Sequence, residues 1–473
     1  MAEAADALHW RLLCLLRVAA PAAKVLECLL RLPPPPEPQD SPADPGEPDP
    51  EADGASSCGW LSEAGQAALL ELLASDPLLR LLGLPRPYRR SLLKRLLAEV
   101  EGRRLALADS LAEGYAETLA EAAGDEAEEG FLYKTFAYGP APDPDDAPSA
   151  QGPSASLPSP LPPEVCERHA ARVARGLAGQ RGPGGALGLE PGPTRPEAGD
   201  AADPPSGPPC GLLSLRLSSN MLAGSTGCHE WEAAFELAER LLGSPELVRG
   251  RRVLELGCGC GLVAAVAARL GAAAVAATDG SAQAVANCAA NLRLNLDGPV
   301  RECGGAQELA GHAEGVCVCQ LSWQEPLPPG GLPYDLVLAS DVLYDPEAVP
   351  VFVGLLERLL TQPAQPLSEE QSSGQEGQGP CSSAAGAGAP SQPRPREVLL
   401  ASLLRNPATL QLFLATAGER GLRVEALPGA GPGAEGESGL GGGGARAVFH
   451  AVPVMEDAGV RGRLRVHRIL GPA

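Results

Sequence analysis

The fold of this chain is decided by the stretch Val253-Leu254-Glu255-Leu256-Gly257-Cys258-Gly259-Cys260-Gly261-Leu262. A short apolar strand runs into three glycines at alternate positions, and an alanine-rich helix at 262–270 follows at once. Glycine lets the backbone turn sharply and approach a ligand closely, because it has no Cβ. The helix then points its amide end at whatever lies in the loop. Glycine-rich turns also occur for structural reasons alone, so the surrounding sequence has to decide.

On both sides of this stretch, strand patterns alternate with helix patterns, which predicts a parallel, doubly wound α/β sheet. The predicted helices are 231–242, 262–270, 281–294, 346–360 and 408–418. The predicted strands are 252–256, 274–278, 316–321, 334–340, 398–403 and 423–426, with 447–452 and 464–469 as closing strands. The α/β domain is therefore expected to span 212–455, and 456–473 is expected to be a C-terminal tail.

The preceding part of the chain has a different character. Leucine stripes within 1–130 predict a small N-terminal helical region, either as a bundle core or as a docking surface for a protein substrate. Alternating patterns at 131–138 and 213–217 predict two strands that pair with each other. Tracts rich in Gly, Pro and Ala predict disorder at 33–56 and in three insertions, at 140–209, 362–396 and 429–444. Within the long insertion at 140–209, only 164–177 has a helical pattern.

Composition narrows the class of partner and the compartment. The 59 acidic residues outnumber 37 basic ones, and the resulting net charge of −22 argues against direct nucleic-acid binding and favours a basic protein partner. The 13 cysteines follow no disulfide or zinc-ligand spacing, which predicts free thiols in the cytoplasm and no metal site. The sequence contains no uninterrupted apolar run of about 18 residues, so no membrane span is expected. We expect a monomer.

The residues that could bind a ligand or take part in catalysis stand where predicted strands end. Ligands bind at the carboxyl ends of strands in such sheets. Asp279 ends the second strand, where a carboxylate can accept hydrogen bonds from a ribose diol. The loop lacks the Gly-Lys-Ser/Thr of a phosphate-binding loop and the additional glycine of a dinucleotide loop. S-adenosyl-L-methionine has a ribose and no pyrophosphate, and Glu255 suits its ammonium group.

These features resemble the seven-strand protein-lysine methyltransferases. The resemblance rests on the strand and glycine loop, Asp279, Leu321-Ser322-Trp323, and Asp341-Val342-Leu343-Tyr344, since Asp-x-x-Tyr is typical of that family. Four further stretches narrow it to the branch that methylates a lysine of eukaryotic elongation factor 2: Tyr88-Arg89-Arg90, Gly224-Ser225-Thr226-Gly227 leading to Trp231, 341–347 and 404–413. The resemblance covers residues 60–138 and 212–452. The long insertions and the tail depart from the family pattern.

The resemblance implies a Rossmann-like seven-strand sheet and a site for S-adenosyl-L-methionine. The expected donor-binding residues are Trp231 and Trp323 beside the adenosine, Gly257, Cys258 and Gly259 around the methionine part, and Glu255, Gly261, Asp279 and Ser340. Asp341 would lie beside the channel for the target lysine, as an orienting group rather than a strong base, and Tyr344 would shape that channel. The expected activity is methylation of a lysine of elongation factor 2.

Simpler interpretations stay open for these residues. Asp279 and Asp341 are each positioned to cap the next helix, and either tryptophan fits a core or rim position. The functional alternatives are a lysine methyltransferase for another protein and a non-catalytic scaffold with a methyltransferase fold. Donor binding would separate the scaffold from the two enzymes.

Overall fold

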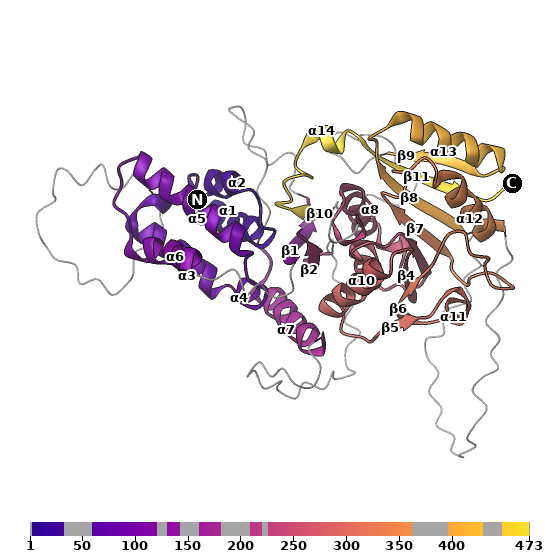
Figure 1. The fold of residues 1–473 in the computed structure, drawn as a ribbon, viewed down its shortest axis with the longest axis horizontal. Coiled ribbons are helices and arrows are strands. Elements are labelled where there is room, and N and C mark those ends of the chain that lie inside the picture. Colours follow the sequence, from indigo (N-terminus) through magenta and orange to yellow (C-terminus); the bar gives the residue numbers. More distant parts are fainter. Residues whose placement is uncertain are drawn as a thin grey trace, which may run out of the picture. The chain divides into compact units, whose positions relative to one another are not determined.

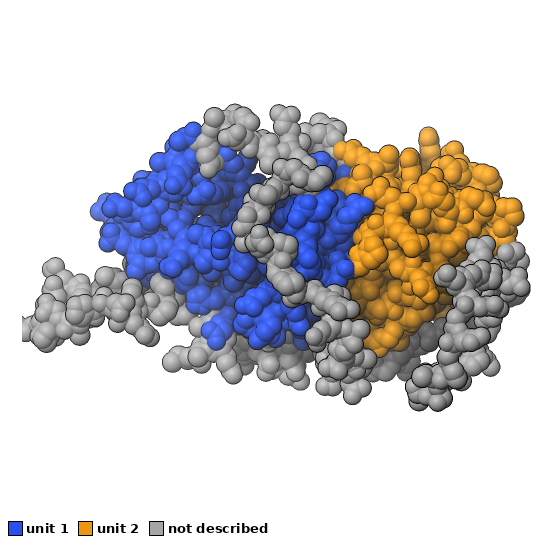
Figure 2. All heavy atoms as spheres, turned by 90° about the horizontal axis from the view of Figure 1, so that it is seen from below, with its two compact units in different colours: residues 1–230, 290–297, 440–461 blue, residues 231–289, 298–439, 462–473 orange. Residues whose placement is uncertain are grey.

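The computed structural model describes residues 2–32, 59–120, 130–141, 160–180, 209–219, 226–361, 396–428 and 447–472. They divide into two compact units, unit 1 with residues 1–230, 290–297 and 440–461, and unit 2 with residues 231–289, 298–439 and 462–473 (Figure 2). Several sequence predictions lie outside the described residues: the tracts 33–56 and 429–444, nearly all of 362–396, the flanks of the 140–209 insertion, and Gly224-Ser225.

The described part of unit 2 is built on an eight-stranded sheet with the order β5-β6-β4-β3-β7-β8-β11-β9 (Figure 1). Neighbouring strands from β5 to β8 are parallel, and β11 is antiparallel to both β8 and β9. The strands are β3 (Arg252–Leu256), β4 (Ala274–Asp279), β5 (Val300–Cys303), β6 (Gly315–Gln320), β7 (Leu336–Ser340), β8 (Glu397–Leu403), β9 (Arg423–Leu427) and β11 (Leu464–Leu470). The predicted doubly wound α/β fold is confirmed, but the described sheet has eight strands where the resemblance implied seven.

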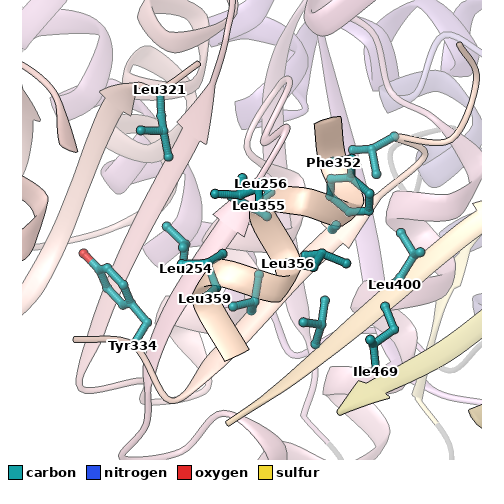
Figure 3. Close-up of a cluster of buried hydrophobic side chains, with 14 of the residues drawn as sticks. Leu254, Leu256, Leu321, Tyr334, Phe352, Leu355, Leu356, Leu359, Leu400 and Ile469 are labelled. Atoms are coloured by element: carbon teal, nitrogen blue, oxygen red, sulfur yellow. The ribbon is translucent and has the colours of Figure 1, made fainter. Parts of the chain in front are cut away.

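Helices cover both faces of this sheet, which explains why its central strands are largely apolar. The helices are α8 (Glu232–Gly243), α9 (Leu262–Arg269), α10 (Ala282–Asn295), α11 (Ala306–Ala310), α12 (Val349–Thr361) and α13 (Pro407–Glu419). On one face, Leu254 and Leu256 of β3 join a buried cluster with Phe352 and Leu356 of α12 and Leu400 of β8 (Figure 3). This packing fixes β3, and with it the start of the glycine loop.

Unit 1 combines helices with a second, smaller sheet. Its longer helices are α1 (Ala2–Arg17), α2 (Ala22–Leu29), α3 (Glu63–Ser75), α4 (Pro77–Leu82), α5 (Arg86–Gly102), α6 (Asp109–Ala120) and α7 (Pro163–Gln180), with short α14 (Ala458–Arg461). The predicted leucine stripe of α5 is buried at Leu92, Leu93, Leu96 and Val100. The predicted pairing of the two strands is also confirmed, because β1 (Phe131–Pro140) and β2 (Gly211–Ser218) are antiparallel neighbours.

The structure corrects three of the sequence predictions. Residues 447–450 form β10, which pairs with β1 in unit 1 instead of closing the main sheet. The closing strand predicted at 464–469 is confirmed as β11, which lies between β8 and β9, and the predicted domain boundary at 455, with a C-terminal tail after it, is thereby corrected. Residues 163–180, inside the interval predicted to be disordered, form α7 and bury His169, Ala170 and Val173 on one face. A short strand pattern does not reveal its partner, and the Pro- and Gly-rich flanks of α7 obscure its helical stripe.

Two negative results are limited to the described residues. No helix among them is both long and apolar enough to cross a membrane. No group of three or more His, Cys, Asp or Glu side chains in the same ranges is arranged to hold a metal ion.

Candidate active site

The predicted site residues of unit 2 follow the carboxyl ends of parallel strands. Glu255 is the penultimate residue of β3, Asp279 the last of β4, and Ser340 the last of β7. Trp323 comes shortly after β6, and Asp341 comes directly after β7. Because these strands are parallel, their carboxyl ends share one edge of the sheet, where ligands of such folds bind. The topology therefore brings the residues selected from the sequence to a common edge.

The glycine loop owes its glycines to backbone geometry and to the protein's own side chains. Gly257, Gly259 and Gly261 have φ values of 70°, 52° and 81°, in the left-handed region that favours glycine. A Cβ at Gly257 would stand 2.8 Å from Cγ1 of Val342, and one at Gly261 would stand 2.7 Å from Sγ of Cys288. The sequence interpretation assigned this space to the ligand. At these two positions, neighbouring side chains already occupy it.

Cys258 anchors the centre of the loop. Its backbone N–H donates to the carbonyl of Thr278 in β4 at 2.8 Å. Its buried thiol is hydrogen-bonded to that of Cys288 in α10, and this bond together with burial raises the pKa of Cys258 well above its ordinary value. A thiol held in this way stays protonated, so the side chain of Cys258 packs within the protein. The predicted place of Cys258 around the methionine part of the donor stays a prediction.

Asp279 connects the loop to β4. Its Oδ2 accepts the N–H of Gly259 at 3.1 Å, and its Oδ1 accepts the N–H of Ser281 at 2.9 Å. Burial raises its pKa, while the backbone hydrogen bonds oppose that shift. The Ser281 side chain accepts the N–H of Ala284 in the first turn of α10, so Ser281 provides the side-chain cap. The interpretation of Asp279 as the cap of this helix is therefore not needed.

Glu255 is a buried carboxyl with spare acceptor capacity. Glu255 is only 1% exposed, and burial raises the pKa of its carboxyl well above the usual range. The backbone N–H of Ala264 hydrogen-bonds to it, but its Oε2 has no partner among the residues that the structure describes. A buried acceptor without a partner is costly. This environment fits a ligand that carries a cationic donor such as an ammonium group.

The two tryptophans are half-buried near the same edge. The Trp323 ring packs on Phe352 of α12 with 5.0 Å between ring centroids. Its Cζ2 also lies 3.9 Å from the position of a Cβ on Gly257, so the ring borders the start of the glycine loop. Trp231 precedes α8, and the guanidinium of Arg405 lies 5.3 Å from its ring centroid. Both rings thus combine packing with a position at the site edge.

Asp341 forms a two-point ion pair that the sequence interpretation missed. Its Oδ1 and Oδ2 each lie 2.7 Å from a guanidinium nitrogen of Arg405, which follows β8. Asp341 is 9% exposed and has a φ of 56°. The next helix, α12, begins only at Val349, so Asp341 does not cap it. The sequence places both residues shortly after predicted strands, but that these strands are neighbours is known only from the structure.

Tyr344 differs from the other predicted residues because its side chain is largely in solvent. It is 65% exposed and lies three residues beyond Asp341, in the segment that leads to α12. An exposed aromatic side chain of this kind suits contact with a macromolecule more than support of the core. Its predicted role in shaping a lysine channel stays a prediction.

Comparison with known proteins gives a family match over this part of the chain. Residues 213–373 match a family model described as lysine methyltransferase. The protein-lysine N-methyltransferase EFM3 of Chaetomium thermophilum is 33% identical over 158 residues, which cover 31% of this chain and 43% of that protein. The protein-lysine N-methyltransferase EEF2KMT of Homo sapiens is 32% identical over 228 residues, which cover 47% and 59%. The chain therefore spans about half the length of these relatives.

A third relative and a solved structure complete the comparison. The protein N-lysine methyltransferase METTL21A of Danio rerio is 36% identical over 149 residues, which cover 31% of this chain and 61% of that protein. A TehB-like SAM-dependent methyltransferase from Corynebacterium glutamicum aligns with a TM-score of 0.28 and 11% identity, over 50% of this chain and 87% of its own. The family match agrees with the lysine methyltransferase resemblance and with S-adenosyl-L-methionine as the cofactor. The matched residues include the glycine loop, Asp279, Trp323 and Asp341.

Proposed function

We propose that this chain is an S-adenosyl-L-methionine-dependent protein-lysine N-methyltransferase. The observation that carries the proposal is the single sheet edge that holds Glu255, Asp279 and Asp341 within the segment matching the lysine methyltransferase family. This edge holds a buried carboxyl whose Oε2 has no partner among the described residues and two further carboxylates, which would meet an ammonium group, a ribose and a target amine.

Each donor-side residue would contact a different chemical group of the donor. Glu255 would accept hydrogen bonds from an ammonium group through its unpartnered Oε2. Asp279 would accept from ribose hydroxyls, because each carboxylate oxygen has two lone pairs and the carboxylate can accept more than the backbone N–H groups it now holds. Trp231, Trp323 and Ser340 would border the adenosine and line the site, with the backbone of residues 257–259 around the methionine part. When bound, S-adenosyl-L-methionine supplies a methyl group attached to a sulfonium.

The acceptor-side residues would orient the target amine. Attack on a sulfonium methyl group needs a neutral amine aligned with the bond that breaks, so positioning dominates the rate. Asp341 would orient that nitrogen. Because Arg405 already occupies both oxygens of Asp341 at 2.7 Å, Asp341 is poorly suited to act as a strong general base. Tyr344 would contact the substrate at the exposed side.

For the substrate, we propose a lysine of eukaryotic elongation factor 2. Support comes from the narrower sequence resemblance at 88–90 and 404–413, and the net charge of −22 favours a basic partner. The helices of unit 1, including α5 with Tyr88, would contribute to substrate docking. No disulfide bond joins the described cysteines, which supports a cytoplasmic location for the reaction.

The proposal is tested with the full chain, labelled donor and purified elongation factor 2, alongside a lysate. We expect label on a lysine of elongation factor 2, located by mass spectrometry, and no label with the Asp279→Ala variant. Label only on other lysate proteins would contradict the proposed substrate and support another lysine methyltransferase. Absence of both label and donor binding by calorimetry, with Asp279→Ala indistinguishable from the wild type, would indicate a scaffold.

A further inference from the structure

We propose that Arg405 is a positioning residue of this site, which fixes the carboxylate of Asp341 and neutralises its charge beside the target amine. The inference rests on the proposed function and deepens it. It concerns a residue outside the matched segment 213–373. Three observations carry it: the geometry of the ion pair, the backbone conformation of Asp341, and the contact between Arg405 and Trp231.

The ion pair joins the ends of two neighbouring strands. Asp341 follows β7, Arg405 follows β8, and the two strands are parallel neighbours with Ser340 beside Ala401. Both carboxylate oxygens of Asp341 lie 2.7 Å from separate guanidinium nitrogens. This two-point contact restricts rotation of the carboxylate, which a single point charge such as a lysine ammonium does not do. Arg405 therefore determines the direction in which Asp341 presents its oxygens.

The backbone of Asp341 needs such support. Its φ of 56° lies in the left-handed region, which is uncommon for residues other than glycine, although aspartate adopts it more readily than most. Its N–H donates to the carbonyl of Ala401 at 2.9 Å, which fixes the main chain. Arg405 fixes the side chain. Strained residues of this kind cluster at functional sites, where a defined orientation matters.

The same guanidinium also reaches the side of the site expected to hold the donor. It lies 5.3 Å from the ring centroid of Trp231 and 3.4 Å from Oε2 of Glu232, in the first turn of α8. Stacking on an aromatic ring combined with a two-point carboxylate contact is a combination that arginine provides and lysine does not. Arg405 thus couples the position of Trp231 to that of Asp341.

The charge of Arg405 matters for the protonation of the target lysine. The charged groups that act on Arg405 are Asp341, from the loop after β7, and Glu232, from α8. On the side of β11, the neighbouring contact is a backbone one, in which the carbonyl of Arg463 accepts the N–H of Leu404. With Arg405 present, Asp341 belongs to a neutral pair. Without it, the bare carboxylate would stabilise the ammonium form of a nearby lysine and raise that lysine's pKa. The reactive neutral amine would then form only at higher pH.

The test is the pH dependence of kcat/KM for Arg405→Gln, Arg405→Lys and the double variant Asp341→Asn with Arg405→Gln. In Arg405→Gln we expect kcat/KM to fall by about one to two orders of magnitude. We also expect the acidic limb of its pH profile to shift to higher pH by about one unit. Arg405→Lys keeps the charge, so its limb should stay at the wild-type pH while the rate falls through lost two-point geometry. In the double variant the limb should return towards the wild-type position, because removing both members of the Asp341–Arg405 pair leaves the net charge beside the amine as it is in the wild type, with Glu232 still present.

Arg420→Gln is the matched control. Arg420 is 42% exposed in its side chain against 39% for Arg405, and it pairs with Glu357 at the far end of α13. Its pH profile should match the wild type. An Arg405→Gln variant that folds, loses rate and keeps the wild-type limb would overturn the inference, because a purely structural residue behaves in that way. A wild-type protein that methylates nothing would overturn the proposed function as well, and the wild-type arm reveals this separately.

Discussion

The two sides of the candidate site hold their carboxylates in different ways. On the donor side, after β3 and β4, the side chains of Glu255 and Asp279 meet backbone N–H groups of Ala264, Gly259 and Ser281. On the acceptor side, after β7 and β8, Asp341 meets the side chain of Arg405, 64 positions away in the sequence. Backbone contacts come with the loop itself, whereas a side-chain pair depends on two distant residues. The donor side is therefore built into a local motif, and the acceptor side is assembled by the sheet.

The largest expected effect separates the two sides directly. Asp341→Asn removes the charged partner of Arg405 and the orienting carboxylate, so we expect kcat/KM to fall by about 100- to 1,000-fold. Donor affinity, measured by calorimetry, should stay within about twofold because the donor side keeps its own contacts. A parallel loss of donor binding would show that Asp341 belongs to the donor side.

Asp335→Asn is the control for this variant. Asp335 also pairs with an arginine, since its carboxylate contacts Arg252 at 3.0 Å, but it stands just before β7, at the opposite edge of the sheet. Loss of that pair should lower stability and leave kcat/KM near the wild-type value. Equal losses of kcat/KM in both variants would mean that general destabilisation explains the result.

On the donor side, Glu255→Gln should weaken donor binding by about 10- to 100-fold, the usual worth of a hydrogen bond to a charged group. Burial raises the pKa of Glu255. The carboxyl is neutral below that pKa and ionises as the pH rises through it, so wild-type donor affinity should increase with pH over that window. In the variant this dependence should disappear. Calorimetry across pH measures both quantities.

Without donor, the same shift predicts a change in stability. A carboxyl whose pKa is raised in the folded protein contributes stability that is fully present below its unfolded pKa and is lost as the pH rises through the folded pKa. Glu255→Gln should not show this loss. The control is Glu397→Gln, which breaks buried ion pairs with Arg251 and Arg468 at the start of β8. That variant should lose stability and keep donor affinity, and loss of donor affinity there would argue against the assigned role of Glu255.

A third test addresses the glycine loop, where two glycines differ in their surroundings. Gly261→Ala places a Cβ 2.7 Å from Sγ of Cys288 at a φ of 81°. Gly250→Ala places one at a φ of 68° with no heavy atom within 4 Å. The backbone cost is shared, so Gly261→Ala should lower the free energy of unfolding by about 1–3 kcal/mol more than Gly250→Ala does. Denaturant unfolding measures it, and equal losses would mean that Cys288 moves aside.

The smallest effect is expected at Tyr344, which is 65% exposed. Tyr344→Ala should leave the unfolding free energy within about 0.5 kcal/mol of the wild type, as for most surface substitutions. Donor affinity should not change, while KM for the protein substrate should rise. Loss of donor affinity in this variant would place Tyr344 on the donor side of the comparison.

The same contrast explains how far the sequence alone could lead. Most strands and helices of unit 2 and the positions of Glu255, Asp279 and Asp341 at strand ends were predictable, because each stands at a fixed offset from an apolar strand, whereas the short β5 and α11 were not predicted. Arg405 was part of a recognised stretch, but only the register between β7 and β8 shows that it faces Asp341. The contact between Gly261 and Cys288 likewise depends on how α10 packs. Strand partners and helix packing are non-local, so periodicity does not encode them.

The same limit applies to unit 1. The pairing of β1 with β2 followed from two alternating patterns, whereas the third strand, β10, comes from residues 447–450. The burial of α7 depends on distant partners, since Nε2 of His169 lies 2.9 Å from Oγ of Ser214 in β2. Its helical pattern at 164–177 was visible in the sequence, but the low-complexity flanks led to a prediction of disorder for the whole interval. Tertiary contacts, and not the composition of the interval, determine its structure.

The position of β10 has a consequence for the order of events during translation. The ribosome delivers β1 and β2 early, but the strand that pairs with the other edge of β1 is made only when residue 450 has been added. Unit 1 therefore cannot complete its sheet as an independent amino-terminal module while the rest of the chain is still being synthesised. Until then, one edge of β1 exposes unpaired backbone groups, the kind of surface that chaperones shield in nascent chains.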